Sequence, residues 1–254
     1  MPQIINGKMP DGIQNPSAAK ELVLPHQQQV TGMVVVQRAT IVRYLLLAGA
    51  VLFLLHGLVV LAIYSGRADS FLPTWQATFY FDKEGNLPSF FSAFLLLLAS
   101  LFLGLIAACK QQEKNFFSGY WVALALIFLF LGIDEAAGMH ELVLSKFSNG
   151  HVVWGQASGA AMLVFATFYY QFYKSLNKAT RRGFFVAGFC FLFGAVGLEM
   201  VGTGLLAQGM NDRELAFMLV MTLEEVFEMG SILYFVSVLL QYLKNYPVLG
   251  IAVK

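Results

Sequence analysis

The sequence predicts an all-α, polytopic membrane protein, a bundle of about six transmembrane helices with both termini in the cytoplasm. Hydrophobic residues make up 58% of the chain and charged residues only 12%, whereas soluble domains carry roughly 25% charged residues. Long apolar runs recur along the chain, and each reaches the roughly 20 residues that a membrane-spanning helix needs. The expected spans are 41–64, 89–109, 119–144, 154–174, 183–206 and 215–242.

The distribution of Lys and Arg predicts the orientation of these helices. If the N-terminus is cytoplasmic, twelve of the 16 basic residues fall on the inner side. Cytoplasmic loops of membrane proteins carry an excess of basic residues, so both termini are expected inside. The four basic residues left on the outer side are Arg67, Lys83, Lys146 and Arg213.

The chain divides into three parts by composition. Residues 1–38 are polar and are expected to form a disordered cytoplasmic tail, because they contain no apolar segment long enough to span. Residues 39–244 are expected to form the six-helix transmembrane domain, and 245–254 a short cytoplasmic C-terminal tail. The apolar composition makes the lipid bilayer an expected partner. The formal net charge is +1 and no part of the chain forms a basic domain, so nucleic acid is not an expected partner.

Acidic residues interrupt the apolar runs. Seven of the fifteen Asp and Glu residues fall inside the expected spans, where the only basic residues are Arg43 and Lys174 at the inner edge. A charge at bilayer depth is costly, so an ionisable residue there indicates a functional site. The seven are Asp134, Glu135, Glu141, Glu199, Glu224, Glu225 and Glu228.

The depth of these residues suggests one site in the outer half of the bilayer. Counted along antiparallel helices, the polar groups lie roughly 10–15 Å below the outer helix ends at 1.5 Å per residue. Residues far apart in the sequence would then meet in one layer. The polar groups at this depth are His56, Asp134, Glu199 and Glu225.

The charge balance of this layer points to a bound cation or to bound protons. Carboxylates that lie close together in a low dielectric cannot all stay ionised. Histidines nearby favour a divalent metal such as Fe, Mn or Zn, since imidazole and carboxylate together suit such ions. The expected ligands are Glu135, His140, Glu199, Glu225 and Glu228. The residues expected to orient these ligands or to relay protons are Asp134, Glu141, Glu224, His56 and His151. His56 fits equally well as a packed, hydrogen-bonded histidine.

The long outer loop at 65–88 offers two interpretations. In one, Asn86 caps the second helix and Pro88 occupies its first turn. In the other, Asp82, Glu84 and Asn86 form an oxygen-rich loop that binds a cation or covers the site from outside.

Two family resemblances rest on these residues. The pattern Asp134-Glu135-(four residues)-His140-Glu141, the Glu-Gly-Asn-x-Pro start of the second helix and the late Glu-Glu pair resemble uncharacterised bacterial multi-pass membrane proteins over roughly residues 80–242. That resemblance implies a bacterial cytoplasmic membrane and brings no known activity. A looser likeness is to the alkaline ceramidase and adiponectin-receptor superfamily, membrane hydrolases with a histidine-held zinc. Their late His-x-x-x-His pair is absent, and Glu224 and Glu228 occupy that spacing.

The sequence is compatible with three classes of function. The first is a metal-dependent membrane enzyme acting on a lipidic or quinone-like substrate, because helix bundles hold metals with inward Glu and His side chains. The second is a proton- or cation-coupled transporter, because buried acids serve such relays. The third is an accessory subunit of a larger membrane complex. The sequence decides neither whether the protein is an enzyme nor its oligomeric state.

Overall fold

The computed structural model describes residues 34–66, 72–83, 85–139, 164–246 and 251–253. All of them belong to one unit, Val34–Lys254.

Within the described residues, five helical stretches are long and apolar enough to cross a membrane. They are α1 (Arg38–Tyr64), α3 (Leu87–Gln112), α4 (Ser118–Ala137), Lys178–Ala207, and α9 (Leu215–Leu243). Lys178–Ala207 consists of α7 (Lys178–Leu192), the π-helix η2 (Phe193–Leu198) and α8 (Glu199–Ala207).

The surfaces of these helices carry exposed apolar side chains. Leu46, Leu54 and Leu61 of α1 are 55%, 66% and 64% exposed. A monomeric soluble protein rarely exposes so large an apolar area. A helix with every backbone bond satisfied internally and an apolar surface is the form that a bilayer accepts. The chain is therefore a multi-pass helical membrane protein.

Five of the six expected spans correspond to these stretches. The fourth, 154–174, is described only from residue 164, and residues 164–175 are helical. The third was expected to reach residue 144, but α4 ends at Ala137. Its C-cap, Gly138, is left-handed with φ 57°, a conformation that commonly ends a helix and that glycine adopts at little cost.

Three short elements were not predicted. The helix α2 (Leu72–Phe79) lies in the long loop between the first two spans. The strands β1 (Val34–Val36) and β2 (Ile251–Val253) pair in parallel, with Val34 opposite Ile251. These strands fall inside the segments expected to be N- and C-terminal tails, and residues 1–33 lie outside the described residues.

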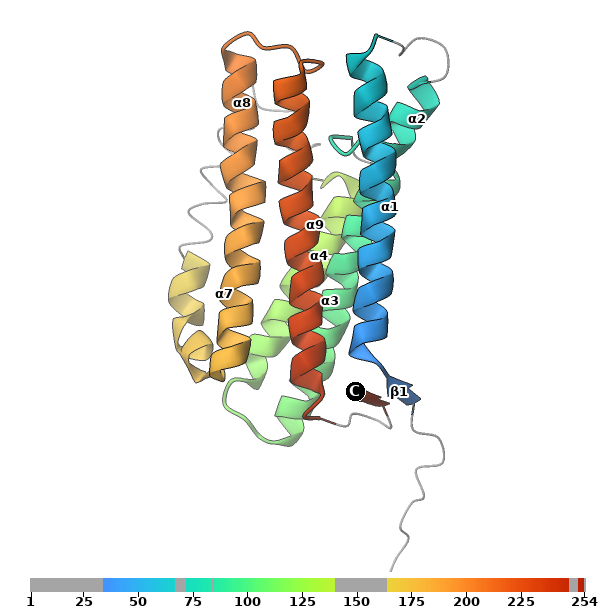
Figure 1. The fold of residues 1–254 in the computed structure, drawn as a ribbon. Helices are drawn as coiled ribbons and strands as arrows, with labels where there is room; N and C mark the ends of the chain where they lie inside the picture. The colour runs from blue at the N-terminus through green and yellow to red at the C-terminus, as the bar shows by residue number, and fades with distance from the viewer. Residues whose placement is uncertain (1–33, 67–71, 84, 140–163, 247–250, 254) are drawn as a thin grey trace, which may run out of the picture. The chain divides into compact units, whose positions relative to one another are not determined.

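The helix α9 lies at the centre of the arrangement. It contacts α1, α3, α7, η2 and α8, while α4 packs on α3. Figure 1 shows α9 between α1 on one side and α7 and α8 on the other. The most deeply buried side chains come mainly from α3 and α9; those with no exposed surface are Leu95, Ala99, Leu103, Ile106, Val236, Leu239 and Leu240.

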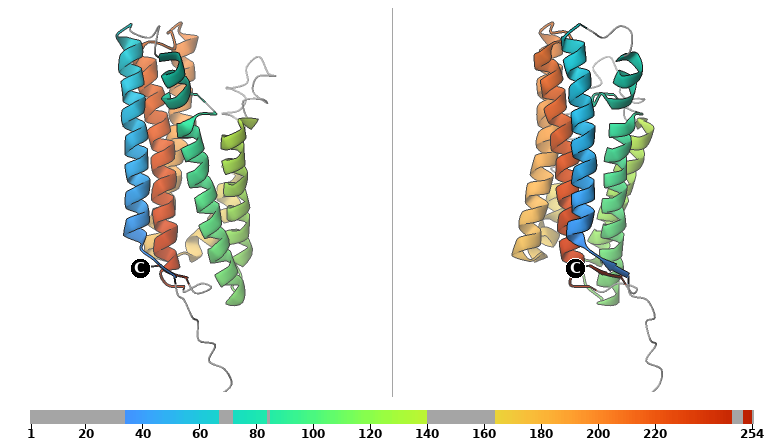
Figure 2. Two further views of the ribbon diagram at one scale, coloured as in Figure 1. Left: turned by 90° about the vertical axis from the view of Figure 1, so that its right-hand side faces the viewer. Right: turned by 45° about the vertical axis from the view of Figure 1, so that its right-hand side comes forward.

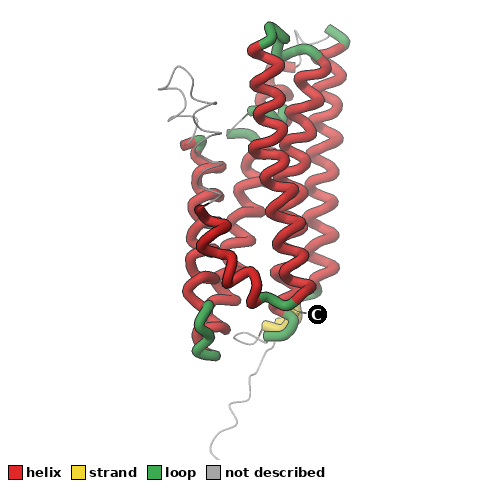
Figure 3. Tube along the Cα trace, turned by 90° about the vertical axis from the view of Figure 1, so that its left-hand side faces the viewer, coloured by secondary structure: helices red, strands yellow, loops and turns green. Residues whose placement is uncertain are grey.

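The two ends of the bundle differ. At the end where α2 lies, α3 and α4 stop short of the level that α1, α8 and α9 reach (Figure 2). The strands lie at the opposite end (Figure 3). We call these the α2 end and the strand end.

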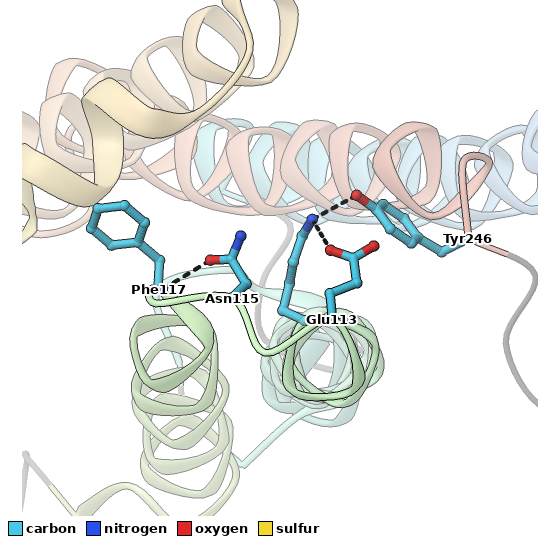
Figure 4. Close-up of polar contacts among 5 residues, drawn as sticks. Glu113, Asn115, Phe117 and Tyr246 are labelled. Atoms are coloured by element: carbon cyan, nitrogen blue, oxygen red, sulfur yellow. Dashed lines mark hydrogen bonds and ion pairs between the residues drawn. The ribbon is translucent and has the colours of Figure 1, made fainter. Parts of the chain in front are cut away.

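A polar cluster joins α3 to the segment after α9 at the strand end (Figure 4). Lys110, which is 8% exposed, donates hydrogen bonds from Nζ to Glu113 Oε2 at 2.8 Å and to the Tyr246 hydroxyl at 2.6 Å. Its ammonium also lies 4.6 Å from the centre of the Tyr246 ring. The buried charge is therefore paired, as burial requires.

Close packing of α7 and η2 against α9 depends on two glycines. A Cβ at Gly183 would lie 2.7 Å from Val238 Cγ2, and one at Gly194 would lie 3.0 Å from the Glu224 carbonyl oxygen. Small residues allow helix backbones to approach closely in membranes. Gly194 thus brings η2 against the part of α9 that carries Glu224.

Candidate acidic site

Three carboxylates of α9 lie within electrostatic range of acidic residues from two other helices and one loop. Glu225 interacts electrostatically with Glu228, Glu135, Glu224 and Asp82. Glu228 interacts with Glu224, Glu135 and Glu199. We call these residues the acidic cluster: Asp82, Glu135, Glu199, Glu224, Glu225 and Glu228.

The π-helix η2 sets the position of Glu199. It ends at Leu198, directly before Glu199 opens α8. A π-helical turn inserts an extra residue, so the helix that follows is rotated by about 100° relative to an unbroken α-helix. Gly194 meanwhile packs on α9, where an added Cβ would be 3.2 Å from Glu228 Cγ. The geometry brings Glu199 within electrostatic range of Glu224 and Glu228.

The end of α4 contributes Glu135. Asp134 and Glu135 lie in the last turn of α4, which ends at Ala137. We expected Asp134 to be about ten residues, roughly 15 Å, from the end of this helix, but α4 ends at Ala137, three residues after Asp134. A helix C-terminus carries about half a negative charge. The backbone of α4 therefore adds negative potential next to a carboxylate that already interacts with Glu225 and Glu228.

Asp82 lies at the α2 end of the acidic cluster. Its side chain is exposed, yet it interacts electrostatically with Glu224 and Glu225. Asp82 follows α2 and precedes α3, the helix that stops short of the bundle's α2 end. The acidic cluster therefore extends from the partly buried face of α9 to the solvent-accessible loop between α2 and α3.

His56 of α1 holds the loop that carries Asp82. The Phe81 N–H donates to His56 Nδ1 at 3.1 Å, so in the neutral ring the hydrogen is on Nε2. Nε2 then donates to Thr222 Oγ1 at 2.8 Å, and the Thr222 hydroxyl donates to the Met218 carbonyl at 2.6 Å. The Phe81 ring stacks on the imidazole at 4.1 Å. Both nitrogens of His56 are engaged, which matches the packed, hydrogen-bonded alternative for this residue.

Asn86 caps α3. Its Oδ1 accepts the Ser89 N–H at 3.0 Å, and its Nδ2 donates to the Tyr80 carbonyl at 2.6 Å. Pro88 lies in the first turn, as the helix-start interpretation predicts. The amide of Asn86 thus stabilises the loop and the start of α3.

Burial, with Asp82 and Asp212 nearby, raises the pKa of the Tyr80 hydroxyl above its usual value.

Four of the residues predicted for the site lie outside the described residues: Glu84, His140, Glu141 and His151. Among those described, no group of three or more His, Cys, Asp or Glu side chains is arranged to hold a metal. One oxygen of the cluster, Glu224 Oε2, is buried and has no hydrogen-bond partner in the described part of the chain. Among the described residues, the acids therefore lie within electrostatic range of one another without being arranged as a ligand set.

An apolar cavity lies further along α9 towards the strand end. Its volume is about 290 Å³, and α3, α4, residues 164–175, α7 and α9 line it. Ser231 of α9 is one of its few polar wall residues, and its hydroxyl donates to the Glu228 carbonyl at 2.7 Å. The acidic cluster and the cavity are therefore neighbours along one helix.

Sequence reasoning missed the π-helix, the contacts of His56 and the cavity. The stretch Gly194-Ala195-Val196-Gly197 offered one signal, because small residues indicate close helix packing. Thr222 carried no separate signal, since hydroxyl side chains often bond to the backbone of their own membrane helix.

The fold and the acidic cluster define a class: a multi-pass helical membrane protein with clustered carboxylates among its helices. A family model described as a domain of unknown function (DUF8692) matches residues 44–242, and the chain belongs to this family. No curated protein and no solved structure matches the chain. The expected likeness to uncharacterised membrane proteins agrees with this family. The comparisons show no link to the ceramidase and adiponectin-receptor superfamily.

Proposed function

We propose that this protein is a membrane enzyme that holds a divalent cation in the acidic cluster and acts on a lipidic substrate. The observation that carries the proposal is the convergence of carboxylates from α4, α8, α9 and the loop after α2. Like charges at this depth repel one another and lose hydration, and a cation relieves both costs. The buried Glu224 Oε2 is an acceptor that such a cation or a proton would satisfy.

The ligands in this proposal are Glu135, Glu199, Glu225 and Glu228, with His140 as the nitrogen donor. The described residues hold no ready group of three ligands, so the cation would have to draw neighbouring carboxylates together. Oxygen ligands with one imidazole suit Fe, Mn or Zn. A cation held there would polarise a carbonyl or phosphoryl group, or activate a water molecule.

We further propose that both termini face the cytoplasm, in a bacterial cytoplasmic membrane. The support is the excess of Lys and Arg on the side of the termini. This orientation puts the α2 end outside and places the acidic cluster in the outer half of the bilayer.

A proton- or cation-coupled transporter is the second candidate, and η2 favours it. The π-helix interrupts a membrane-spanning stretch directly before Glu199. π-Helical turns inside α-helices are frequent at functional sites, and acids inside a membrane serve as proton relays.

Metal analysis of protein purified without chelators separates the two candidates. We expect near-integral Fe, Mn or Zn in the wild type and a large loss in Glu225→Gln, which keeps the size of the side chain and removes its charge. The matched control is Glu214→Gln, because Glu214 is an exposed carboxylate before α9 and outside the acidic cluster. Wild-type protein that carries no metal would reject the metal enzyme and favour proton coupling.

A further inference from the structure

The apolar cavity has the size and lining of a site for a hydrocarbon chain. Its volume of about 290 Å³ lies near the lower end of ligand pockets, roughly 300–1,000 Å³. Phenylalanine, leucine and isoleucine side chains form most of the wall, and the polar exceptions are Tyr169, Tyr173 and Ser231. A cavity of this kind excludes water, because water needs two or more polar partners.

The cavity opens between membrane-spanning helices. Ile127 of α4 and Phe185 of α7 both line it, and they are 37% and 61% exposed. Exposed apolar side chains on such helices face lipid hydrocarbon. The molecules that can reach this opening are therefore those dissolved in the bilayer.

The other end of the cavity is next to the acidic cluster. Ser231 lines the wall three residues after Glu228, a rise of about 4.5 Å along α9. Phe235, one turn further, also lines the wall. A chain lying along this part of α9 would bring a polar head to the level of Glu228 and Glu224.

We propose that the cavity binds the hydrocarbon chain of a membrane amphiphile whose polar head lies at the acidic cluster. This assignment of the chain site rests on the proposed function, since it names the substrate class of the same site. A lipid chain that leaves the bilayer gains little from the hydrophobic effect. Binding therefore depends on close packing against the ring-lined wall, and filling the cavity should weaken it.

Trp121 provides a reporter for this site. It is 1% exposed, and its ring lies 5.0 Å from Phe172 and 5.8 Å from Phe184, both of which line the cavity. The chain has three tryptophans, so Trp75→Phe with Trp154→Phe leaves Trp121 alone. Bromine quenches tryptophan at short range, and a brominated fatty acid in the cavity should quench Trp121 saturably.

Gly188→Leu is the variant that fills the cavity. Gly188 lines it, and an added Cβ there meets nothing within 4 Å, so the substitution should leave the fold intact. We expect the half-saturating concentration to rise by about tenfold, because a side chain that occupies the cavity removes packing contacts with the ligand. The matched control is Gly57→Leu in α1, which also has open space at Cβ and is not part of the wall.

Two further measurements identify the type of hydrocarbon chain and test the cavity independently of the proposed metal site. Competition by unlabelled oleate assigns an acyl chain, competition by farnesol assigns an isoprenoid, and competition by neither overturns the proposal. If the brominated probe still quenches Trp121 in Glu225→Gln, the cavity binds the chain whether or not the acidic cluster binds metal. Unsaturable quenching in the wild type, or equal quenching in wild type and Gly188→Leu, also overturns it.

Discussion

Replacing His56 with Phe tests whether this residue holds the loop that carries Asp82. Phenylalanine keeps a flat ring that can stack on Phe81, so the packing changes little. It removes the acceptor for the Phe81 N–H and the donor to Thr222 Oγ1. The Thr222 hydroxyl still donates to the Met218 carbonyl, so the main cost falls on the Phe81 N–H.

The size of this cost follows from burial. Phe81 is 3% exposed, and a buried N–H without a partner costs about 1–3 kcal/mol. The lost bond to Thr222 adds about 0.5–1.5 kcal/mol. We expect His56→Phe to lower the free energy of unfolding by about 1.5–4.5 kcal/mol in total. Tyr64→Phe, at a side chain of α1 that is 65% exposed, should stay within about 0.5 kcal/mol of the wild type.

A double-mutant cycle isolates the contact between the imidazole and the hydroxyl. Thr222→Val removes the hydroxyl, and its coupling with His56→Phe should be about 0.5–1.5 kcal/mol. The unfolding free energies are measured by denaturant titration in mixed micelles. If His56→Phe is as stable as the wild type, His56 does not hold this loop, and a coupling of zero would reject the contact between His56 and Thr222.

Three further predictions concern packing, ionisation and topology. Gly183→Ala should lower the free energy of unfolding by about 1–3 kcal/mol through overpacking against Val238, while Gly188→Ala should not, as thermal unfolding will show. The folded-state pKa of Tyr80 is raised, so the neutral hydroxyl stabilises the fold. This contribution should be full below the unfolded pKa of about 10 and should be lost as pH rises through the folded pKa. Tyr80→Phe should remove this loss of stability at alkaline pH. A reporter fused at Lys254 should read as cytoplasmic, and a periplasmic signal would overturn the topology.

The helical spans could be predicted because hydropathy is a local property. Five apolar stretches coincide with five described helical stretches, and Asn86 with Pro88 marks the start of α3. The pairing of β1 with β2 could not be predicted, since it joins two three-residue strands near opposite ends of the chain. The π-helix was also missed, because an apolar run has the same composition whether its backbone hydrogen bonds join residues four or five positions apart.

The acidic cluster could be predicted in part, from depth and charge. Counting residues from the helix ends placed Glu199 and Glu225 in one layer, and the structure brings both into one group of interacting carboxylates. For Asp134 the count used a helix end at residue 144, whereas α4 ends at Ala137 before Gly138, although the apolar pattern continues. The role of His56 depends on the Phe81 backbone and on Thr222 of α9, and no local pattern connects these three residues.

The acidic cluster lies where the regular backbone is interrupted on two sides. α4 ends at Ala137, two residues after Glu135, and η2 ends directly before Glu199. At bilayer depth, irregular backbone is tolerated only where protein buries it or where it lines a polar cavity. A helix C-terminus presents carbonyl oxygens without intrahelical donors, and these are acceptors like the carboxylates around them. The C-terminal carbonyl groups of α4 thus add acceptors beside the carboxylates, and such a site favours a bound cation or bound protons. The Glu225→Gln metal analysis distinguishes the two.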